Sequence, residues 1–333
     1  MRVSVIATVK NEEASIGQLL ESLLSQTRRP DEIVLVDGGS TDRTTEIVEE
    51  FIDRGAPITL VVEPGANISR GRNVAIATAT ADIIAATDAG VRLAPCWLEE
   101  LIKPFENPVG PAVDVVGGFF VADPHTLFEV AMGATVLPAL DEIDPARFLP
   151  SSRSVAFRKS AWGAVGGYPE WLDYCEDLIF DLDLKRGGFR FAFAPGALVH
   201  FRPRPDLRAF FRQYYRYARG DGKALLWGKR HIVRYSTYIV GYIALWGGFW
   251  YKILWLALAM AAAAYLYGPY RRLRPLMRGR GLGDWATTIL LVPVIRLVGD
   301  VAKMVGYPAG LAWRYQHRRD LARPVHHHRQ LQR

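Results

Sequence analysis

The residues best suited to chemistry in the first part of the chain stand in three short polar strings. These are Lys10-Asn11-Glu12, Asp37-Gly38-Gly39-Ser40-Thr41-Asp42 and Thr87-Asp88-Ala89-Gly90, and each follows an apolar run. Carboxylates such as those of Asp37 and Asp42 can accept hydrogen bonds from a base or a ribose hydroxyl. An aspartate such as Asp88 can hold a divalent cation that bridges two phosphates, because Mg²⁺ commonly takes only one or two protein carboxylates. Taken singly, each string also suits an ordinary helix start or turn.

Two further strings carry charge near predicted helix starts. Arg70 and Arg72 stand where a diphosphate could be bound by guanidinium groups and helix N–H groups together. Glu176 and Asp177 begin a later predicted helix, where a carboxylate could take the proton of an attacking hydroxyl. Asp181 lies one turn beyond Asp177 on the same face, either as its partner or as surface charge. The plain alternatives are a solvated basic turn and the acidic residues that are common at helix N-termini.

Alternating strand and helix patterns position these strings. Apolar runs predict buried strands at 3–9, 32–37, 58–63 and 83–88, and helical patterns lie at 15–26, 42–54, 69–79 and 95–106. This alternation predicts an α/β fold, a mainly parallel sheet flanked by helices. Ligands of such sheets bind beyond the carboxyl ends of the strands. The three polar strings are therefore expected to converge on one crevice.

The second half of the chain has a more mixed pattern. It predicts a strand at 115–121, a helix at 176–186, two short strands at 189–193 and 197–201, and a basic amphipathic helix at 206–230. Gln213 and Arg216 lie three positions apart on that last helix and so share a face. They could bind an anion or an acceptor, or the helix could simply be a solvated, lipid-facing one.

Charge is divided unevenly along the chain. Residues 202–333 hold 24 lysines and arginines against 5 aspartates, whereas residues 1–201 hold 17 against 29 acidic residues. A basic segment can bind nucleic acid or anionic lipid. The apolar and aromatic content of this segment favours membrane lipids and not nucleic acid. The two cysteines, Cys96 and Cys175, fit a reduced cytosolic setting, and the N-terminus shows no cleavable signal pattern.

A nearly continuous apolar run covers residues 235–268 and is rich in tyrosine and tryptophan, which prefer the membrane–water interface. Residues 286–298 are apolar but short, and Pro293 and Arg296 interrupt them. The loop between these segments carries five arginines from Arg271 to Arg280, and such loops stay cytoplasmic. We therefore expect a hairpin, re-entrant or interfacial arrangement at the cell membrane, with the catalytic domain on the cytoplasmic side. A buried, soluble helix pair is the alternative.

Together these strings resemble the family-2 glycosyltransferases, which have the GT-A fold, over roughly residues 1–225. Val9-Lys10-Asn11-Glu12 is similar to the family's opening motif, and the string at 36–42 to its nucleoside-binding turn. Thr87-Asp88-Ala89-Gly90 takes the place of its D-x-D metal motif, and Glu176-Asp177 that of its catalytic-base pair. Gln213-Tyr214-Tyr215-Arg216-Tyr217 is similar to the Q-x-x-R-W motif of membrane-bound members.

The resemblance implies an inverting, single-displacement transfer from a nucleotide-diphosphate sugar, with Asp177 as general base and Glu176 beside it. It implies a lipid-linked or cell-envelope glycan acceptor. Donor binding is predicted for residues of the matched motifs and for three residues outside them, Thr8, Arg70 and Arg72. The motif residues are Lys10, Asn11, Glu12, Asp37, Gly39, Ser40, Asp42, Gln213 and Arg216.

The metal site departs from the family pattern. Gly90 replaces the second aspartate of D-x-D, so that a divalent cation, Mg²⁺ or Mn²⁺, would depend on Asp88. The resemblance suggests His200 as a further ligand, although a core or turn histidine is an equal interpretation. Tyr217 in place of tryptophan, with the short membrane region, argues against a channel-forming polymer synthase.

Two other functions are compatible with parts of the pattern. A nucleotidyltransferase acting on sugar phosphates would favour a glycine-rich phosphate loop after the first strand, and the sequence has none there. A non-catalytic scaffold that binds nucleotide sugar or lipid is favoured by Gly90 and opposed by the Glu176-Asp177 pair. The expected organisation is a catalytic domain at 1–230, with a nucleotide-binding half at 1–110 and an acceptor half at 111–230. A membrane-associated helical region at 231–316 and a basic tail at 317–333 follow.

Overall fold

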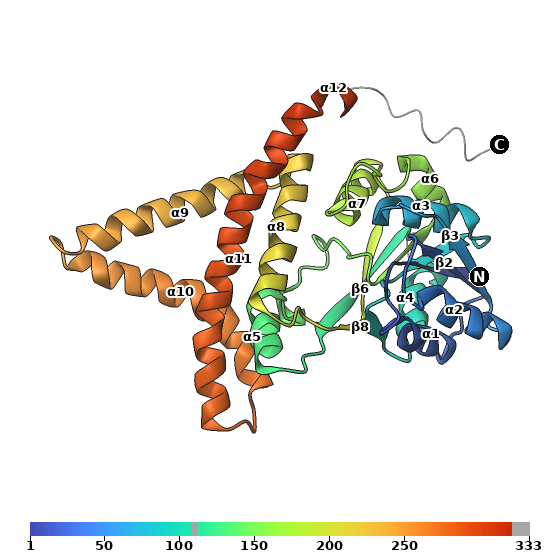
Figure 1. Ribbon diagram of the computed structural model, residues 1–333, viewed down its shortest axis with the longest axis horizontal. Coiled ribbons are helices and arrows are strands. Elements are labelled where there is room, and N and C mark those ends of the chain that lie inside the picture. The colour runs from blue at the N-terminus through green and yellow to red at the C-terminus, as the bar shows by residue number, and fades with distance from the viewer. Residues whose placement is uncertain (108–111, 322–333) are drawn as a thin grey trace. The chain divides into compact units, whose positions relative to one another are not determined.

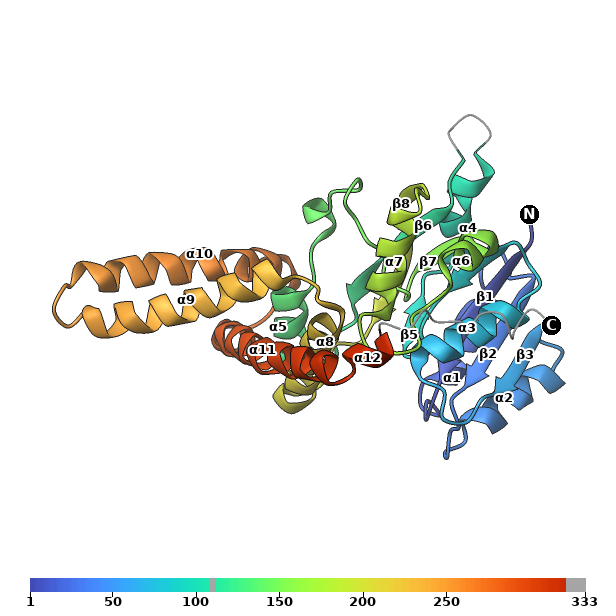
Figure 2. The ribbon, with the colours of Figure 1, turned by 90° about the horizontal axis from the view of Figure 1, so that it is seen from above.

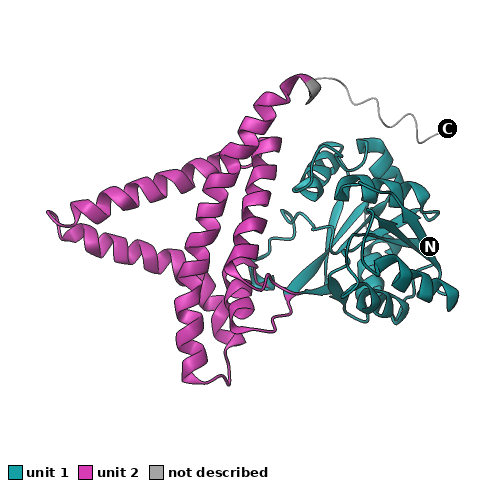
Figure 3. Ribbon diagram, viewed as in Figure 1, with its two compact units in different colours: residues 1–121, 140–201, 325–333 teal, residues 122–139, 202–324 magenta. Residues whose placement is uncertain are grey.

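A computed structural model describes residues 1–107 and 112–321 of the chain. The chain divides into two compact units, teal and magenta in Figure 3. Unit 1 contains Met1–Val121 and Leu140–Phe201, and unit 2 contains Ala122–Ala139 and Arg202–Pro324. The predicted basic tail at 317–333 lies outside the described residues from position 322 onward.

An eight-stranded sheet forms the centre of unit 1, in the order β3-β2-β1-β4-β7-β6-β8-β5 (Figures 1 and 2). The first four strands in that order are parallel to one another. The register pairs Val9 with Asp37 and Ile6 with Ala86, so the carboxyl ends of these strands meet at one edge. The parallel strands are β1 (Val3–Val9), β2 (Glu32–Asp37), β3 (Ile58–Val62) and β4 (Ile83–Ala86).

Antiparallel pairings complete the sheet. β7 runs against both β4 and β6, and β5 runs against β8. The sheet is therefore mixed, with its parallel part in the N-terminal half, and the predicted α/β fold is confirmed. The antiparallel part consists of β5 (Val91–Leu93), β6 (Val115–Ala122), β7 (Val155–Arg158) and β8 (Phe191–Phe201).

Helices cover both faces of this sheet, because each central strand sends apolar side chains to both sides. On β2, Ile33 and Leu35 pack in one core and Val34 and Val36 in the other. The first core includes α1 (Ile16–Leu24), α2 (Thr44–Asp53) and α4 (Trp97–Ile102), and a short 3₁₀ turn, η1 (Lys103–Glu106), follows α4. The second core includes α3 (Ile68–Thr78), α6 (Lys159–Val165) and α7 (Glu176–Arg186).

The sequence located most of these elements and missed the shorter ones. The four parallel strands and α1 to α4 lie within a few residues of their predicted positions. The two strands predicted at 189–193 and 197–201 form one strand, β8, because Pro195 and Gly196 do not interrupt it. β7 and α6 were not predicted, since a four-residue strand and a seven-residue helix are too short to show a period.

Unit 2 is helical and has its own apolar core. Val130 and Met132 of α5 (Leu127–Val136) pack with Phe210 of α8 (Leu207–Ala224) and with Val292 and Ile295 of α11 (Leu282–Gln316). Thr126 caps α5 by accepting from the Glu129 N–H, and Asp206 caps α8 by accepting from the Ala209 N–H. The remaining helices of the unit are α9 (Gly228–Gly247), α10 (Ile253–Leu276) and α12 (Arg318–Leu321).

Helix α11 is much longer than the apolar segment that the sequence showed at 286–298. It runs for 35 residues and contains Pro293 and Pro308. Pro293 and Arg296 interrupt the apolar pattern but not the helix, which packs on α8 and continues through both prolines. Glycines allow this contact: a Cβ added to Gly306 would lie 2.3 Å from the Tyr215 carbonyl oxygen, and one added to Gly222 would lie 2.3 Å from that of Tyr307.

Helices α9 and α10 form an antiparallel hairpin whose tip points away from α8 and α11 in both views of Figures 1 and 2. The single apolar run expected at 235–268 is broken at 248–252, directly after α9 ends at Gly247. The basic helix expected at 206–230 likewise ends at Ala224, and α9 begins at Gly228. Exposed side chains at the tip include Trp246, Phe249, Trp250, Tyr251 and Ile253. Among the described helices, α10 is long and apolar enough to cross a bilayer by length and composition.

Candidate active site

The polar strings after β1 and β2 lie against each other, as the parallel register predicts. The Asn11 N–H donates to Ser40 Oγ at 2.8 Å, and the Thr41 N–H donates to Asn11 Oδ1 at 2.8 Å. Asn11 has a positive φ of 55°, which asparagine tolerates better than most residues. The loop after β1 is therefore held directly on the turn after β2, and Lys10 stands exposed at the same edge.

Asp37 stabilises the turn that follows β2. Its Oδ2 accepts from the N–H groups of Gly39, at 2.9 Å, and Ser40, at 2.8 Å, and its Oδ1 accepts from the Ser40 hydroxyl. The side chain is 1% exposed. Gly39 has a φ of +83°, which a residue with a Cβ rarely adopts. Asp42 behaves in a similar way at the start of α2, where its Oδ1 accepts from the Thr44 N–H and Oδ2 from that of Glu13.

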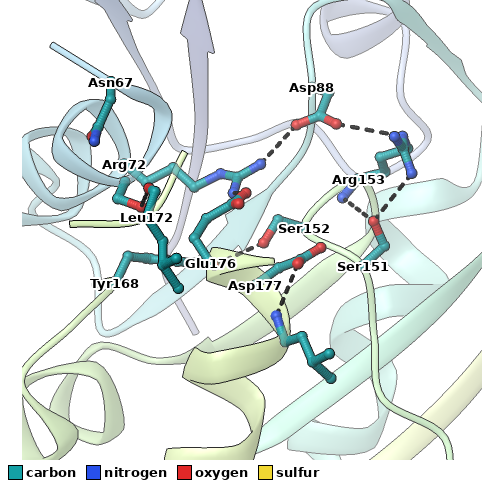
Figure 4. Close-up of polar contacts among 12 residues, drawn as sticks. Asn67, Arg72, Asp88, Ser151, Ser152, Arg153, Tyr168, Leu172, Glu176 and Asp177 are labelled. Carbon is teal, nitrogen blue, oxygen red and sulfur yellow. Dashed lines mark hydrogen bonds and ion pairs between the residues drawn. The ribbon is translucent and has the colours of Figure 1, made fainter. Parts of the chain in front are cut away.

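Helix α3 holds the loop that leads to Glu176. Asn67 caps the helix through the Arg70 N–H at 2.9 Å and donates to the Glu170 carbonyl at 2.7 Å. Two turns further on, Asn73 donates to the Tyr168 carbonyl at 2.8 Å and accepts from the Tyr168 N–H at 2.9 Å. Ser69 donates to the Leu172 carbonyl at 2.9 Å. These contacts fix segment 168–172 on α3, and Asn67, Tyr168 and Leu172 are labelled in Figure 4.

Arg72 links the end of β4 to the start of α7. Its guanidinium donates to Glu176 Oε1 at 2.7 Å and to Asp88 Oδ1 at 2.9 Å, and Arg153 lies 3.4 Å from Asp88 Oδ2 (Figure 4). The Arg72 side chain is 3% exposed, so the interpretation as a solvated basic turn is wrong for Arg72, whereas the Arg70 side chain is 38% exposed. Burial alone would lower the pKa of Arg72, but Asp88 and Glu176 raise it above its ordinary value. Arg72 therefore stays charged. Its guanidinium carbon lies 5.3 Å from the centre of the Tyr168 ring.

Glu176 and Asp177 differ in their surroundings although they are adjacent. Glu176 is 6% exposed. Burial and the Asp177 carboxylate raise the pKa of Glu176 to about 7, against the opposing effect of Arg72. Asp177 is only partly buried, and its Oδ1 accepts from the Leu178 N–H at 2.8 Å. Within the described residues it takes part in no ion pair, so its carboxylate is the more available of the two.

Asp181 is buried one turn beyond Asp177, which rules out the surface-charge interpretation. Its Oδ2 has no hydrogen-bond partner within residues 1–107 and 112–321. Burial, followed by the charge of Asp177, raises the pKa of Asp181 well above its usual range. The residue before Glu176, Cys175, has a φ of 65°. A left-handed residue other than glycine costs free energy, and here it begins the helix that carries both acidic groups.

Asp88 and His200, the two metal candidates, have few other metal-binding side chains around them. Asp88 offers one carboxylate at the end of β4, and both of its oxygens face arginines. His200 lies on β8, opposite Arg92 of β5. No cluster of three or more histidine, cysteine, aspartate or glutamate side chains with metal-site geometry occurs in the part of the chain that the structure describes. A cation at Asp88 would therefore take most of its ligands from phosphate oxygens and water, which suits Mg²⁺.

Four of the predicted binding residues lie outside the ion-pair network of Arg72. Arg70 pairs with Glu63 at 3.1 Å and with Glu170 at 3.6 Å. Gln213, in unit 2, is buried, and its Nε2 donates to the Tyr217 hydroxyl at 2.8 Å. Arg216 is exposed on the same helix. Thr8 packs against α3, where a Cβ added to Gly71 would lie 2.7 Å from its methyl group.

Arg153 is the main site residue that the sequence did not reveal. It pairs with Asp88, and its guanidinium carbon lies 5.0 Å from the centre of the Phe201 ring and 5.7 Å from that of Phe120. Ser151-Ser152-Arg153-Ser154 precedes β7 and has no helix or strand period of its own. Its only signal was a cation among small polar residues, which is too common in loops to single out.

Comparison with known proteins identifies the class to which this fold and site belong. The family model described as "Glycosyl transferase family 2" matches residues 4–159, and "Glycosyl transferase family group 2" matches residues 144–299. The chain therefore belongs to glycosyltransferase family 2. This assignment opposes the nucleotidyltransferase alternative and agrees with an enzyme rather than a scaffold.

Relatives with assigned names are moderately similar. The succinoglycan biosynthesis protein ExoA of Rhizobium meliloti is 26% identical over 235 residues, which are 67% of this chain and 69% of ExoA. The glucosyl-dolichyl phosphate glucuronosyltransferase of Haloferax volcanii is 30% identical over 125 residues, which are 37% of this chain and only 39% of that protein. The chain thus spans little more than a third of the length of the second relative.

Among solved structures, the mannosyltransferase PcManGT from Pyrobaculum calidifontis, in complex with GDP-Man and Mn²⁺, has a TM-score of 0.55. The alignment covers 95% of this chain and 87% of that one at 18% identity. At this identity the likeness concerns the fold, and it agrees with the GT-A architecture expected from the sequence.

Proposed function

We propose that this protein transfers a sugar, with inversion, from a nucleotide-diphosphate donor to a lipid-linked or cell-envelope glycan acceptor. The observation that carries the proposal is the ion-pair chain Asp88–Arg72–Glu176, which ties the end of β4 to the N-terminus of α7. These ion pairs support Asp177 as the base, because they hold the start of α7 next to the strand end where a donor diphosphate is expected.

Each candidate residue receives a role consistent with its surroundings. Asp177 takes the proton from the acceptor hydroxyl as that oxygen attacks the sugar carbon, and the nucleoside diphosphate leaves from the opposite face. Glu176 stays on Arg72 and so positions Asp177 without reacting. The loop Lys10–Glu12 and the turn Asp37–Asp42 bind the nucleoside, with Thr8, Gly39 and Ser40 shaping that edge. Arg70 and Arg72 bind the diphosphate of the donor.

A divalent cation fits the proposal if the donor supplies most of its ligands. Asp88 would hold the cation, with His200 as the second candidate ligand, and the cation would neutralise charge on the leaving diphosphate. Arg72 and Arg153 flank Asp88 and would face the same phosphate oxygens. The mannosyltransferase PcManGT forms a complex with Mn²⁺ and GDP-Man, which supports a metal-dependent reaction here.

The acceptor proposal rests on the relatives and on unit 2. One relative is named for succinoglycan biosynthesis and another for a dolichyl-phosphate-linked substrate. The exposed aromatic and aliphatic side chains of α9 and α10 would hold the protein on the cytoplasmic face of the cell membrane. In this scheme residues 1–230 form the catalytic part, in which Gln213 and Arg216 bind the donor or the acceptor, and residues 231–316 form the membrane-associated part.

A donor screen tests the proposal directly. Full-length protein is incubated with individual nucleotide sugars and extracted membrane lipids, and the released nucleoside diphosphate is measured. We expect release with one or a few donors only when lipid is present, and loss of release in Asp177→Asn. Release that needs no acceptor would indicate a hydrolase, and release of pyrophosphate from a nucleoside triphosphate and a sugar phosphate would indicate a nucleotidyltransferase.

A further inference from the structure

A buried cluster of charged side chains lies in unit 2, centred on Asp300 of α11. Asp300 is 7% exposed. Its Oδ1 accepts from Arg234 Nε of α9 at 2.9 Å, and its Oδ2 accepts from the hydroxyls of Tyr238, at 3.1 Å, and Tyr265. The cluster thus joins both helices of the α9–α10 hairpin to α11.

A histidine extends the cluster toward α8. Arg234 donates to His231 Nδ1 at 3.1 Å, so this ring nitrogen carries no proton. The other nitrogen, Nε2, then donates to Asp221 Oδ2 at 3.3 Å. With this tautomer His231 is neutral, and its ring stacks on Tyr307 with centroids 3.8 Å apart.

Two cations of the cluster, Arg296 and Lys303, form no ion pair within the described residues. Arg296 and Lys303 share a face of α11 with Asp300, at spacings of four and three residues. Arg296 lies 4.5 Å from the centre of the Tyr265 ring, and Lys303 lies 4.9 Å from that of Tyr214. Within residues 1–107 and 112–321, neither side chain makes a hydrogen bond or an ion pair, and Arg296 Nε is fully buried.

The charges of the cluster do not balance. Three cations, Arg234, Arg296 and Lys303, face two carboxylates, Asp221 and Asp300. A partly buried cation without a partner is costly, and a network that only served stability would be expected to pair each one. Arg296 and Lys303 are half-buried, so part of each side chain lies at the surface of the unit. Among the side chains described here, the cluster lacks one negative charge.

The surroundings indicate what kind of molecule supplies that charge. The hairpin that Arg234, Tyr238 and Tyr265 attach to α11 exposes a long apolar surface, which includes Ile239, Val240, Ile243, Leu256 and Met260. A small soluble anion would bind the cations of the cluster but would leave the apolar surface of the hairpin exposed to water. A molecule with a phosphate at one end and a long hydrocarbon chain would use both features. Guanidinium and ammonium groups together also suit the several oxygens of a phosphate.

We propose that Arg296 and Lys303, supported by Arg234 and Asp300, bind the phosphate headgroup of a membrane lipid whose hydrocarbon chain lies along the α9–α10 hairpin. This inference rests on the proposed function and deepens its use of a lipid-linked acceptor. Asp300 acts here as a positioning residue, because it holds Arg234 and both tyrosines in place. Unit 2 thereby has a specific lipid contact in addition to its general apolar surface.

Vesicle binding by the full-length protein tests the site. The vesicles consist of phosphatidylcholine alone or with a polyprenyl phosphate, and binding is measured by co-sedimentation. We expect Arg296→Gln and Lys303→Gln each to weaken binding to the polyprenyl phosphate vesicles by about tenfold, the effect of losing one charge-assisted hydrogen bond. Binding to phosphatidylcholine alone should not change, and Lys303→Arg should retain most of the binding.

Matched controls separate a site from general surface charge. Arg278→Gln and Lys229→Gln remove other cations of the same unit and should change binding by less than the two cluster variants. Equal losses in all four variants would overturn the proposal in favour of diffuse attraction to an anionic surface. Inorganic phosphate that binds as tightly as the lipid phosphate would also overturn it, because the ligand would then be a free anion.

The outcome is independent of the proposed catalytic activity. Donor binding is measured on the same variants without vesicles, and nucleoside diphosphate release is measured with donor and extracted membrane lipids. A protein that shows the lipid result but transfers no sugar would keep this site and lose the proposed function. A protein that transfers sugar but binds lipid equally well with and without Arg296 and Lys303 would keep the function and lose the site.

Discussion

The adjacent carboxylates Glu176 and Asp177 have different surroundings because of the geometry of the α-helix. Successive residues of an α-helix point about 100° apart, so one side chain at the start of α7 faces the interior while its neighbour faces outward. Glu176 is buried on Arg72, and Asp177 is partly exposed. A general base must be free to approach an acceptor hydroxyl, and a buried ion-paired carboxylate is not. The pair therefore divides into a holding group and a reacting group.

Asp177→Asn should lower transfer by about 10²–10⁴-fold, the usual contribution of general-base catalysis. Donor binding should stay nearly unchanged, because Asp177 forms no ion pair with the described arginines beside the strand end. Asp183→Asn, on the same helix but outside the Arg72 network, is the matched control. The measurement is the initial rate of nucleoside diphosphate release alongside the donor dissociation constant. An Asp177→Asn rate within a few-fold of wild type would exclude Asp177 as the base.

Glu176 should make the local stability of α7 depend on pH. Its pKa is raised from 4.5 to about 7, mainly by burial, so folding favours the protonated form. The resulting stability is fully present below about pH 4.5 and is lost as the pH rises through about 7, with a magnitude of about 3 kcal/mol at most. Glu176→Gln should remove this component. Amide hydrogen exchange of α7 at both ends of the window measures it, and an equal slope in the wild type and the variant would contradict it.

Asp88→Ala should weaken nucleoside diphosphate binding when Mg²⁺ or Mn²⁺ is present. Without metal, binding should be unchanged or tighter, because Arg72 and Arg153 lose their shared carboxylate partner and can both face the diphosphate. Asp82→Ala, near the other end of β4, serves as the control. Titration calorimetry with and without a chelator separates the two effects. If the chelator does not change wild-type donor binding or turnover, the reaction does not need a cation.

At the scale of single elements, α3 depends on residues that only the fold brings together. The sequence predicted its position and its arginines, because a local pattern is enough for that. It could not show that Asn73 clamps Tyr168, since the two are separated by 95 positions and joined only by the fold. Arg153 was not predicted for the same reason, because its partner Asp88 lies at the end of a different strand. Strand ends and helix starts are local features, whereas the side chains that hold them are not.

Gly71→Ala should destabilise unit 1 by about 1–3 kcal/mol, the usual cost of overpacking. The new Cβ would lie 2.7 Å from the Thr8 methyl group, and β-branched Thr8 has little freedom to move away. Gly163→Ala, in the middle of α6, meets nothing within 4 Å and should be neutral or stabilising by up to about 1 kcal/mol. Hydrogen exchange of β1 and α6 amides compares the two variants. A stable Gly71→Ala protein would show that α3 can shift away from β1.

At the scale of the whole molecule, the chain combines an acidic N-terminal part with a basic, apolar C-terminal part. Unit 1 contains an enclosed core on both faces of its sheet, whereas the α9–α10 hairpin of unit 2 leaves many large apolar side chains in contact with solvent. An exposed apolar surface of this kind marks a protein or membrane contact. The alternative of a buried, soluble helix pair at 235–268 does not agree with this exposure, because the hairpin covers little of its own surface.

The α9–α10 hairpin is expected to enter the membrane from one side only. Helix α10 would reach about 36 Å, which is enough to cross a hydrocarbon core of about 30 Å. A single crossing, however, would place the five arginines from Arg271 to Arg280 on the far side. Short loops rich in arginine stay on the cytoplasmic side, and near anionic lipid each arginine contributes about 1 kcal/mol of attraction. The aromatic tip formed by Trp246, Phe249, Trp250 and Tyr251 also suits an interface better than the far side of a bilayer. We therefore expect the hairpin to enter one leaflet and return.

Leu276→Cys, in a protein with Cys96 and Cys175 replaced by serine, should react with an impermeant thiol reagent only after the cells are permeabilised. Ala14→Cys in unit 1 is the matched cytoplasmic control. Labelling of position 276 in intact cells, with position 14 protected, would establish a single crossing and overturn the one-leaflet arrangement.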